Sequence, residues 1–356
     1  MAISPSMLSQ LAASGKQAQT TPAQLQVNNA QALQKVAGLD LQIGKTFPIQ
    51  IQKIEGQQVQ FLMAGQRLTA ATELPLQNGM KLEVKVTQLQ PQVTLQVQPA
   101  NKETAQMLAL QTAYRQLLPN QMPLNQGLQQ LWQMSQSPAI SNLIQGALSQ
   151  LFEQLFRPST QMTPQQLKQQ LQGAGLFLEN QLAQKGRPAP QDFKARLLQL
   201  MQWLGSSNQD AQDTLEKPRQ VVSQMLNRLT LQQLQASQHP QTVAIELPLH
   251  PDSELNPIEI DIRKQTASGD PLWEVMVQTS LEAGQIKAKL IYHRATVNAG
   301  LWSDQKALYT TIESQLDQLQ KGLKQAGVAV GRVFMSPHEP QQDQTLEKVA
   351  LIDIHI

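Results

Sequence analysis

The sequence predicts a multi-domain chain with a small N-terminal β-barrel-like module, a Gln/Leu-rich helical middle and a C-terminal α+β domain with one long helix on a mixed sheet. The length of 356 residues exceeds what one hydrophobic core usually serves. Apolar residues alternate with polar ones near both ends of the chain, and recur at helical spacing between them. Glutamine is frequent up to Gln241, whereas between there and Gln305 only Gln265, Gln278 and Gln285 appear. The expected divisions are a disordered leader over 1–37, a β module over 38–99, a helical region over 103–238 and the α+β domain over 241–356.

The leader begins MAISPSMLSQLAASGKQAQTTPAQLQ, which is polar and rich in Ser, Thr and Gln, the composition of a disordered segment. It has neither a basic start nor a continuous apolar stretch, so we expect no cleavable secretory signal. An uncleaved export signal would have the same composition. No apolar run in the chain approaches the ~20 residues of a membrane span, and we therefore expect no membrane insertion.

The β module is indicated by three alternating stretches, "FPIQIQKI", "QQVQFLMAG" and "MKLEVKVTQLQPQVTLQV". Glu55-Gly56 and Asn78-Gly79 are typical turn pairs, so hairpins follow. Short antiparallel strands in this number predict a small barrel. Nucleic-acid-binding barrels usually stack bases on aromatic side chains. Here Phe47 and Phe61 fall at alternating positions typical of a core, which favours a structural module.

The helical region shows apolar residues at helical spacing, as in Leu108, Leu110, Tyr114, Leu117 and Leu118. Thr163-Pro164 predicts a helix start, because a capping hydroxyl precedes a proline at the first helical position. We interpret Trp132 and Trp203 as packing anchors. Together these features predict a Gln/Leu-rich array of helices.

The C-terminal domain is predicted from the alternating stretches "TVAIELPL", "PIEIDIRK", "LWEVMVQTSL" and "GQIKAKLIY". After them, five apolar residues draw one stripe on a long helix, and we expect all five to be core: Leu308, Ile312, Leu316, Leu319 and Leu323. "VAVGRVFM" and "KVALIDIHI" predict two further strands. One amphipathic helix on a sheet gives an α+β domain.

The basic run "GQIKAKLIYHR", 284–294, has three possible interpretations. Its basic residues could form a nucleic-acid-binding patch, belong to a catalytic cluster, or lie on the solvent-exposed face of a strand. Alternation places Ile286, Ala288 and Leu290 on one face, and two lysines, Lys287 and Lys289, on the other. The lysines are therefore expected on the solvated side of a half-buried strand. We place His293 and Arg294 past the end of the strand, in a turn toward the long helix.

Catalytic and metal-binding motifs are missing from the sequence. Cysteine is absent, which excludes disulfides, thiolate zinc sites and cysteine nucleophiles. The five histidines form no HExxH array, and no GxGxxG, GxxxxGK[ST] or GxSxG motif occurs. We therefore expect no enzyme, no cofactor and no metal.

Two alternatives remain open from the residues alone. The first is a non-enzymatic scaffold or adaptor. The second, less favoured at a net charge of +2, is a weak nucleic-acid-binding protein that would use Lys81, Lys85, Lys287 and Lys289. Its affinity would fall steeply as salt rises.

Two stretches carry a family resemblance. Leu281 and Gly284 precede "QIKAKLIY", and the stretches "LWSDQKALYTTIESQLDQLQKGLKQAG", taken as a helix from Trp302 to Ala326, and "VAVGRVFM" follow. This order resembles the C-terminal domain of flagellar hook-length control proteins. In the middle of the chain, "GAGLFLENQLAQ" followed by "DFKARLLQLMQWL" is similar to a segment of longer family members.

The resemblance implies a non-enzymatic protein that controls hook length and switches the substrate specificity of flagellar type III export. It implies a monomer in the bacterial cytoplasm that is then exported through the type III apparatus without a cleavable signal. The implied partners are an export gate component and hook or hook-cap proteins, not nucleic acid. The residues expected at the partner contact are Gly284, Gln285, Lys287, Lys289 and Trp302.

Overall fold

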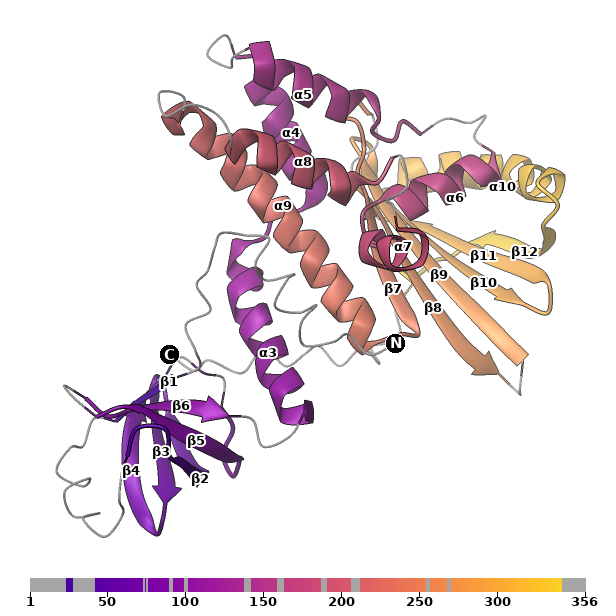
Figure 1. Cartoon of the computed structure of the whole chain (residues 1–356). Coiled ribbons are helices and arrows are strands. Elements are labelled where there is room, and N and C mark those ends of the chain that lie inside the picture. The colour runs from indigo at the N-terminus through magenta and orange to yellow at the C-terminus, as the bar shows by residue number, and fades with distance from the viewer. Residues whose placement is uncertain are drawn as a thin grey trace. The chain divides into compact units, whose positions relative to one another are not determined.

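The computed structural model of the chain (Figure 1) describes residues 24–27, 42–72, 74, 76–89, 92–98, 102–137, 142–158, 163–186, 191–205, 212–253, 257–267 and 270–340. The predicted strand "KVALIDIHI" lies outside these residues. The chain divides into two compact units, 1–120 and 121–356. The first holds a barrel and the second holds a helical region and a sheet.

The first unit is built on a closed antiparallel barrel with the strand order β1-β4-β3-β2-β5-β6. The strands are β1 (Gln24–Val27), β2 (Thr46–Glu55), β3 (Gln58–Met63), β4 (Gln66–Ala71), β5 (Lys81–Gln88) and β6 (Thr94–Gln98). Phe47 and Phe61 are both buried in the barrel core. The predicted small barrel is confirmed, and its two aromatic residues serve the core.

Tight turns join the first barrel strands. Gly56, with a φ of 58°, turns β2 into β3, and Ala64 and Gly65, with φ of 46° and 80°, turn β3 into β4. Two consecutive positive φ values match the twist of a two-residue hairpin. After the barrel, α3 (Lys102–Leu117) and a 3-10 turn (Leu118–Asn120) end the unit, and Leu108 of α3 joins the barrel core.

The position of β1 differs from the sequence prediction. Gln24–Val27 lies inside the stretch 1–37 that was assigned to a disordered leader, yet it pairs with β4 and β6 and closes the barrel. Leu25 and Val27 are buried. A strand of only four residues gives too short an alternation to stand out in a polar segment.

The second unit starts with the helical region, which confirms the predicted helical middle. Its helices are α4 (Leu124–Ser135), α5 (Asn142–Glu153), α6 (Pro164–Gly173), α7 (Leu178–Lys185), α8 (Phe193–Gly205) and α9 (Gln212–Gln238). Buried leucines of α4, α5, α8 and α9 form one core. Thr163 caps α6 through the backbone N–H of Gln166, as predicted. Trp132 packs edge-on against Phe152, with ring centroids 4.9 Å apart, and is a packing anchor.

The C-terminal sheet has six strands in the order β12-β11-β10-β9-β8-β7. They are β7 (Thr242–Leu247), β8 (Ile258–Ala267), β9 (Asp270–Leu281), β10 (Gly284–His293), β11 (Thr296–Ser303) and β12 (Ala329–Met335). β7 to β11 are antiparallel neighbours, whereas β12 runs parallel to β11 and is reached through α10 (Lys306–Gln325). The predicted mixed sheet with one long helix is confirmed.

Strand β11 was not predicted. Arg294 and Ala295, with φ of 48° and 62°, form the turn of a β10–β11 hairpin. Arg294 therefore leads into a strand and not into the helix, and His293 is the last residue of β10. Trp302, expected at the start of the helix, lies in β11, and α10 begins at Lys306.

The two faces of the sheet differ. Register places Val277, Ala288 and Leu301 side by side on one face, which we call the helix face. On it, α10 packs over part of β10, β11 and β12, and Leu176 and its neighbours pack over β7, β8 and β9 (Figure 1). The opposite face, which carries Lys287, Lys289 and Trp302, we call the lysine face.

A buried carboxylate ties the sheet to the helical region. Glu246 of β7 is 2% exposed and its Oε1 accepts hydrogen bonds from the backbone N–H groups of Leu124, at 2.6 Å, and Asn125. Its Oε2 accepts a bond from Arg228 Nε of α9 at 3.2 Å. An acceptor at the N-terminus of α4 satisfies backbone donors that have no partner inside the helix. Glu246 of the edge strand is therefore one of the residues that join the sheet to the helices.

Candidate partner-binding surface

Gly284 lies where the β9–β10 turn meets the start of α10. Its φ is 137°, and a Cβ atom there would come within 2.4 Å of Gln305 Cγ and 2.7 Å of Asp304 Oδ1. The next residue, Gln285, donates its backbone N–H to Asp304 Oδ1 at 2.7 Å. Glycine is required because only it combines this backbone angle with so close an approach. The predicted residue Gly284 thus has a clear role in positioning the turn against α10.

Lys287 and Lys289 lie on the face predicted for them, but both are ion-paired. Lys289 Nζ lies 3.1 Å from Glu274 Oε1, and Lys287 pairs with Glu339, which follows β12. Their side chains are 23% and 24% exposed. The two lysines are therefore half-buried members of ion pairs, and less solvated than alternation alone suggested.

Trp302 completes the predicted set. It lies directly opposite Lys287 in the β10–β11 ladder and is half-buried. The neighbouring Gly300 leaves room for the ring of Phe334, whose Cζ would lie 3.2 Å from a Cβ at that position. The guanidinium of Arg332 lies 4.8 Å from the centroid of the same ring. The structure thus gathers Gln285, Lys287, Lys289 and Trp302 on the lysine face, beside the ring of Phe334 of β12.

Acidic and basic side chains alternate across the lysine face. Glu274 is 6% exposed, lies opposite Arg263 in the β8–β9 ladder and pairs with Lys289. Glu259 accepts a hydrogen bond from Gln278 of β9. Opposite charges on neighbouring strands stabilise a sheet and leave no field of one sign to collect phosphates. This pattern fits recognition of a protein surface better than recognition of nucleic acid.

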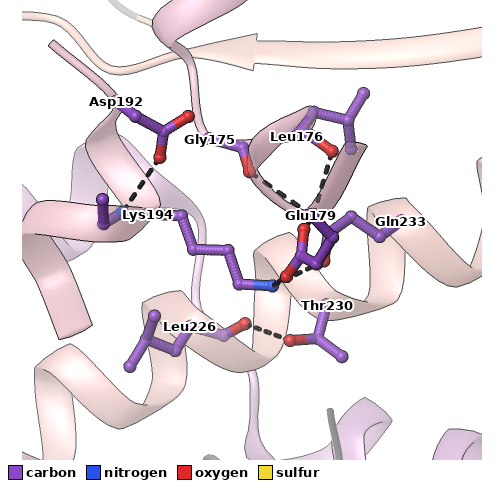
Figure 2. A network of polar contacts seen from close by, with 9 residues as sticks. Gly175, Leu176, Glu179, Asp192, Lys194, Leu226, Thr230 and Gln233 are labelled. Carbon is purple, nitrogen blue, oxygen red and sulfur yellow. Dashed lines mark hydrogen bonds and ion pairs between the residues drawn. The ribbon is translucent and has the colours of Figure 1, made fainter. Parts of the chain in front are cut away.

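The two middle stretches of the family resemblance also meet (Figure 2). Lys194 of α8 has a side chain that is 2% exposed; its Nζ lies 2.5 Å from Glu179 Oε1 and 2.6 Å from Gln233 Oε1. Gln233 of α9 in turn donates Nε2 to the carbonyl of Leu176 at 3.0 Å. Burial lowers the pKa of Lys194, and the carboxylate of Glu179 opposes this effect. The network joins α7, α8 and α9, and sequence reasoning missed it because its members are far apart in the chain.

A second glycine supports this network. Gly175 has a φ of 97°, and a Cβ there would lie 2.9 Å from the backbone nitrogen of Lys194. Asp192 accepts the backbone N–H of Ala195 at 2.9 Å, which caps the first turn of α8. Burial raises the pKa of Asp192. The "GLFLE" and "DFK" stretches are therefore two sides of one packed junction.

A histidine lies at the seam between α5 and the end of β7. His250 is 4% exposed, and the ring of Trp132 packs against it with centroids 5.4 Å apart. Arg157 donates to His250 Nε2 at 2.8 Å, the backbone N–H of Asp252 lies 3.2 Å from His250 Nδ1, and Asp252 Oδ2 lies 3.5 Å from the same Nδ1. Burial, together with the guanidinium of Arg157, lowers the pKa of His250, and Asp252 opposes them. Protonation of the His250 ring therefore weakens the packing between α5 and the end of β7.

The described residues contain no group of three or more His, Cys, Asp or Glu side chains arranged to hold a metal ion. None of their helices combines the length and apolar character that crossing a bilayer requires. A small pocket beside His250, lined by Asn125, Gln129 and Leu249 among others, has room for about one water molecule and no larger ligand.

The fold and the lysine face define a multi-domain protein whose C-terminal sheet offers a mixed charged and aromatic surface. Residues 261–344 match the family model described as flagellar hook-length control protein FliK. The match runs from within β8 to beyond β12 and includes every residue predicted for the partner contact. Residues 261–344 are therefore similar to flagellar hook-length control proteins. No curated protein and no solved structure matches the chain.

Proposed function

We propose that this protein controls flagellar hook length and switches the substrate specificity of flagellar type III export through protein contacts of its C-terminal domain. The observation that carries the proposal is the match of 261–344 to the hook-length control family. That family is regulatory and non-enzymatic, and the proposed action requires binding alone. The partners proposed from the resemblance are an export gate component and hook or hook-cap proteins.

The proposed route of the protein starts in the bacterial cytoplasm and continues through the type III apparatus as a monomer. We assign the uncleaved export signal to 1–23, the part of the predicted leader that precedes β1. A chain without cysteine passes through a channel with no disulfide to reduce. Folded units must open during passage, because an extended chain is the form that a narrow channel admits.

The proposed contact surface is the end of the lysine face around Gln285, Lys287 and Trp302. Gln285 is exposed, and Lys287 and Trp302 are half-exposed neighbours across the β10–β11 ladder. Tryptophan is enriched among the residues that carry most of the energy of protein interfaces. The ion pair of Lys287 with Glu339 must be exchanged for contacts with the partner, which would make the interface selective for an acidic group on the partner.

The test is the hook-length distribution, measured by electron microscopy of detached hook-basal bodies from a strain that lacks this gene. We expect overlong hooks with few filaments, and normal length when the wild-type gene is returned. A Lys287→Glu gene should fail to restore length. A Lys324→Glu gene, which makes the same charge change on the exposed last turn of α10, should restore it.

Each outcome has a distinct meaning. Hooks of normal, narrow length in the strain without the gene would refute the hook-length role. Full restoration by Lys287→Glu would leave that role intact and move the contact surface away from this end of the lysine face. Equal failure of both variants would point to misfolding or to a general effect of negative charge.

A further inference from the structure

Helix α10 leaves much of its apolar side uncovered. Tyr309, Ile312 and Leu316 pack on the helix face of the sheet, against Val333 and Met335 of β12 among others. No residue of α10 is fully buried, however, and Leu319, predicted as core, is 38% exposed. An amphipathic helix of 20 residues normally buries its apolar stripe. On the helix face, part of the apolar side of α10 is therefore left without a covering strand or helix among the described residues.

The same side of the sheet ends in an open strand. Within the part of the chain that the structure describes, β12 pairs with β11 alone and is the last strand of the sheet. An edge strand presents backbone N–H and C=O groups to any extended segment that can reach it. Arg332 of β12 is exposed and lies on the lysine face, as does Phe334, which pairs with Gly300. The edge thus offers backbone groups, a positive charge and, on its other face, the uncovered side of α10.

One segment of this chain has the matching pattern. In "KVALIDIHI", 348–356, alternation puts Ala350, Ile352, Ile354 and Ile356 on one side, and Val349, Leu351, Asp353 and His355 on the other. Isoleucines on the helix face would cover the exposed side of α10. In that register Asp353 falls on the lysine face, where Arg332 lies. The isoleucine side of the segment is therefore complementary to the uncovered side of α10, and Asp353 is complementary in charge to Arg332.

The connection is long enough. The ion pair of Glu339 with Lys287 places the chain beside β10 on the lysine face. From β10 to a position outside β12 there are three strand spacings, about 15 Å at ~4.8 Å each. Residues 340–347 reach up to about 26 Å at ~3.3 Å per residue. A segment tethered this closely has an effective concentration on the order of millimolar, which favours it over an edge partner in solution.

We propose that residues 348–356 pair with the outer edge of β12 as an antiparallel seventh strand of the C-terminal sheet. Antiparallel order follows because a chain that leaves the end of β12 returns along it, whereas a parallel strand needs a crossover connection. Ile352 and Ile354 cover the exposed side of α10, and Asp353 faces Arg332. This inference does not depend on the proposed function, and its test uses the purified chain alone.

The first experiment uses the absence of native cysteine. Arg332→Cys is combined in the full chain with Leu351→Cys, Asp353→Cys or His355→Cys, and in matched controls with Ile352→Cys or Ile354→Cys. Under mild oxidation we expect an intrachain disulfide for at least one member of the first set and at least tenfold less for the controls. Equal crosslinking of both sets would overturn the proposal, because a loose tether shows no face preference. Disulfides found only between chains would assign the edge to a second copy and also overturn it.

The second experiment measures hydrogen exchange of the β12 amides. We expect exchange at least tenfold slower in the full chain than in a chain lacking 348–356, with tryptophan fluorescence showing that both remain folded. Arg332→Asp should speed exchange, and Arg332→Asp with Asp353→Arg should slow it again. Unchanged exchange on deletion would overturn the proposal. Protection that arises only when another protein is added would assign the edge to that partner instead.

Discussion

Replacing Gly284 by alanine should destabilise the second unit by about 2–4 kcal/mol. A non-glycine residue at a φ of 137° costs roughly 1–3 kcal/mol in backbone strain. The new Cβ would also lie 2.4 Å from Gln305 Cγ and 2.7 Å from Asp304 Oδ1, so the side chains of Gln305 and Asp304 must move. Movement of Asp304 breaks the 2.7 Å hydrogen bond from the Gln285 N–H to its Oδ1, which contributes about 1 kcal/mol at an exposed site.

Urea denaturation followed by tryptophan fluorescence can measure this change for the second unit alone. All four tryptophans, Trp132, Trp203, Trp273 and Trp302, lie in that unit. Gly322→Ala is the matched control: it lies in α10 with no atom within 4 Å of its Cβ position and should stabilise by about 0.5–1 kcal/mol. If Gly284→Ala unfolds within about 0.5 kcal/mol of the wild type, the packing argument for this glycine is wrong, since that is the range of surface substitutions.

Three further changes test the other polar groups of the second unit by the same denaturation assay. Lys194→Met should cost about 2–3 kcal/mol because Glu179 and its network lose their buried partner, and Lys194→Met with Glu179→Leu should recover most of it; an additive loss in the double variant would contradict this. The lowered pKa of His250 means that the unfolded chain takes up a proton more readily than the folded one, so stability should fall as pH drops below 6.5 and not change for this reason above it. His250→Gln should remove that component, and an unchanged pH profile would show that another group causes it. Lys289→Glu should cost about 1–3 kcal/mol by placing a carboxylate beside a buried one, whereas Lys287→Glu, whose partner is exposed, should cost under about 1 kcal/mol; equal losses would mean that the burial of the two partners does not matter.

The barrel shows which strands a sequence can reveal. β2, β3, β5 and β6 were visible because each alternates over five or more residues beside a turn. β1 was not visible, because Gln24–Val27 has only Leu25 and Val27 as apolar residues in a polar segment. Its strand conformation depends on β4 and β6, whose residues lie far along the chain. The local alternation of apolar and polar residues therefore cannot predict a short strand that is stabilised by pairing with distant strands.

The β10–β11 hairpin was missed for a different reason. Its turn consists of Arg294 and Ala295, and both have positive φ, a conformation usually taken by Gly, Asn or Asp. Without one of those residues the turn has no sequence signal. The following "TVNAGLWS" was therefore divided between a turn and the start of the helix, and Trp302 was placed on the wrong element.

The predicted core stripe of α10 was right in its period and only partly right in its burial. Ile312 and Leu316 pack on the sheet, but Leu319 does not. Spacing along a helix identifies which residues share a side, whereas the width of the sheet beneath decides how many of them are covered. The apolar side of α10 extends beyond the last described strand of the sheet, β12. This uncovered apolar surface is the basis for the proposed seventh strand.

Each of the two stretches that carry the family resemblance contains a glycine that packs against the start of a helix. Gly284 packs against the start of α10 beside Asp304, and Gly175 packs against the start of α8 beside Lys194. In each case a positive-φ glycine lets a turn approach the first residues of a helix. A change at such a glycine should reduce function by lowering the stability of the domain, and so it cannot locate a partner. The residues that can locate one are those whose change leaves the domain folded, and Lys287, with its exposed ion-pair partner, is the best placed of the predicted set. A residue that contacts the partner can therefore be distinguished from one that only stabilises the domain. Its variant should keep the urea midpoint of the wild type and still lose hook-length control.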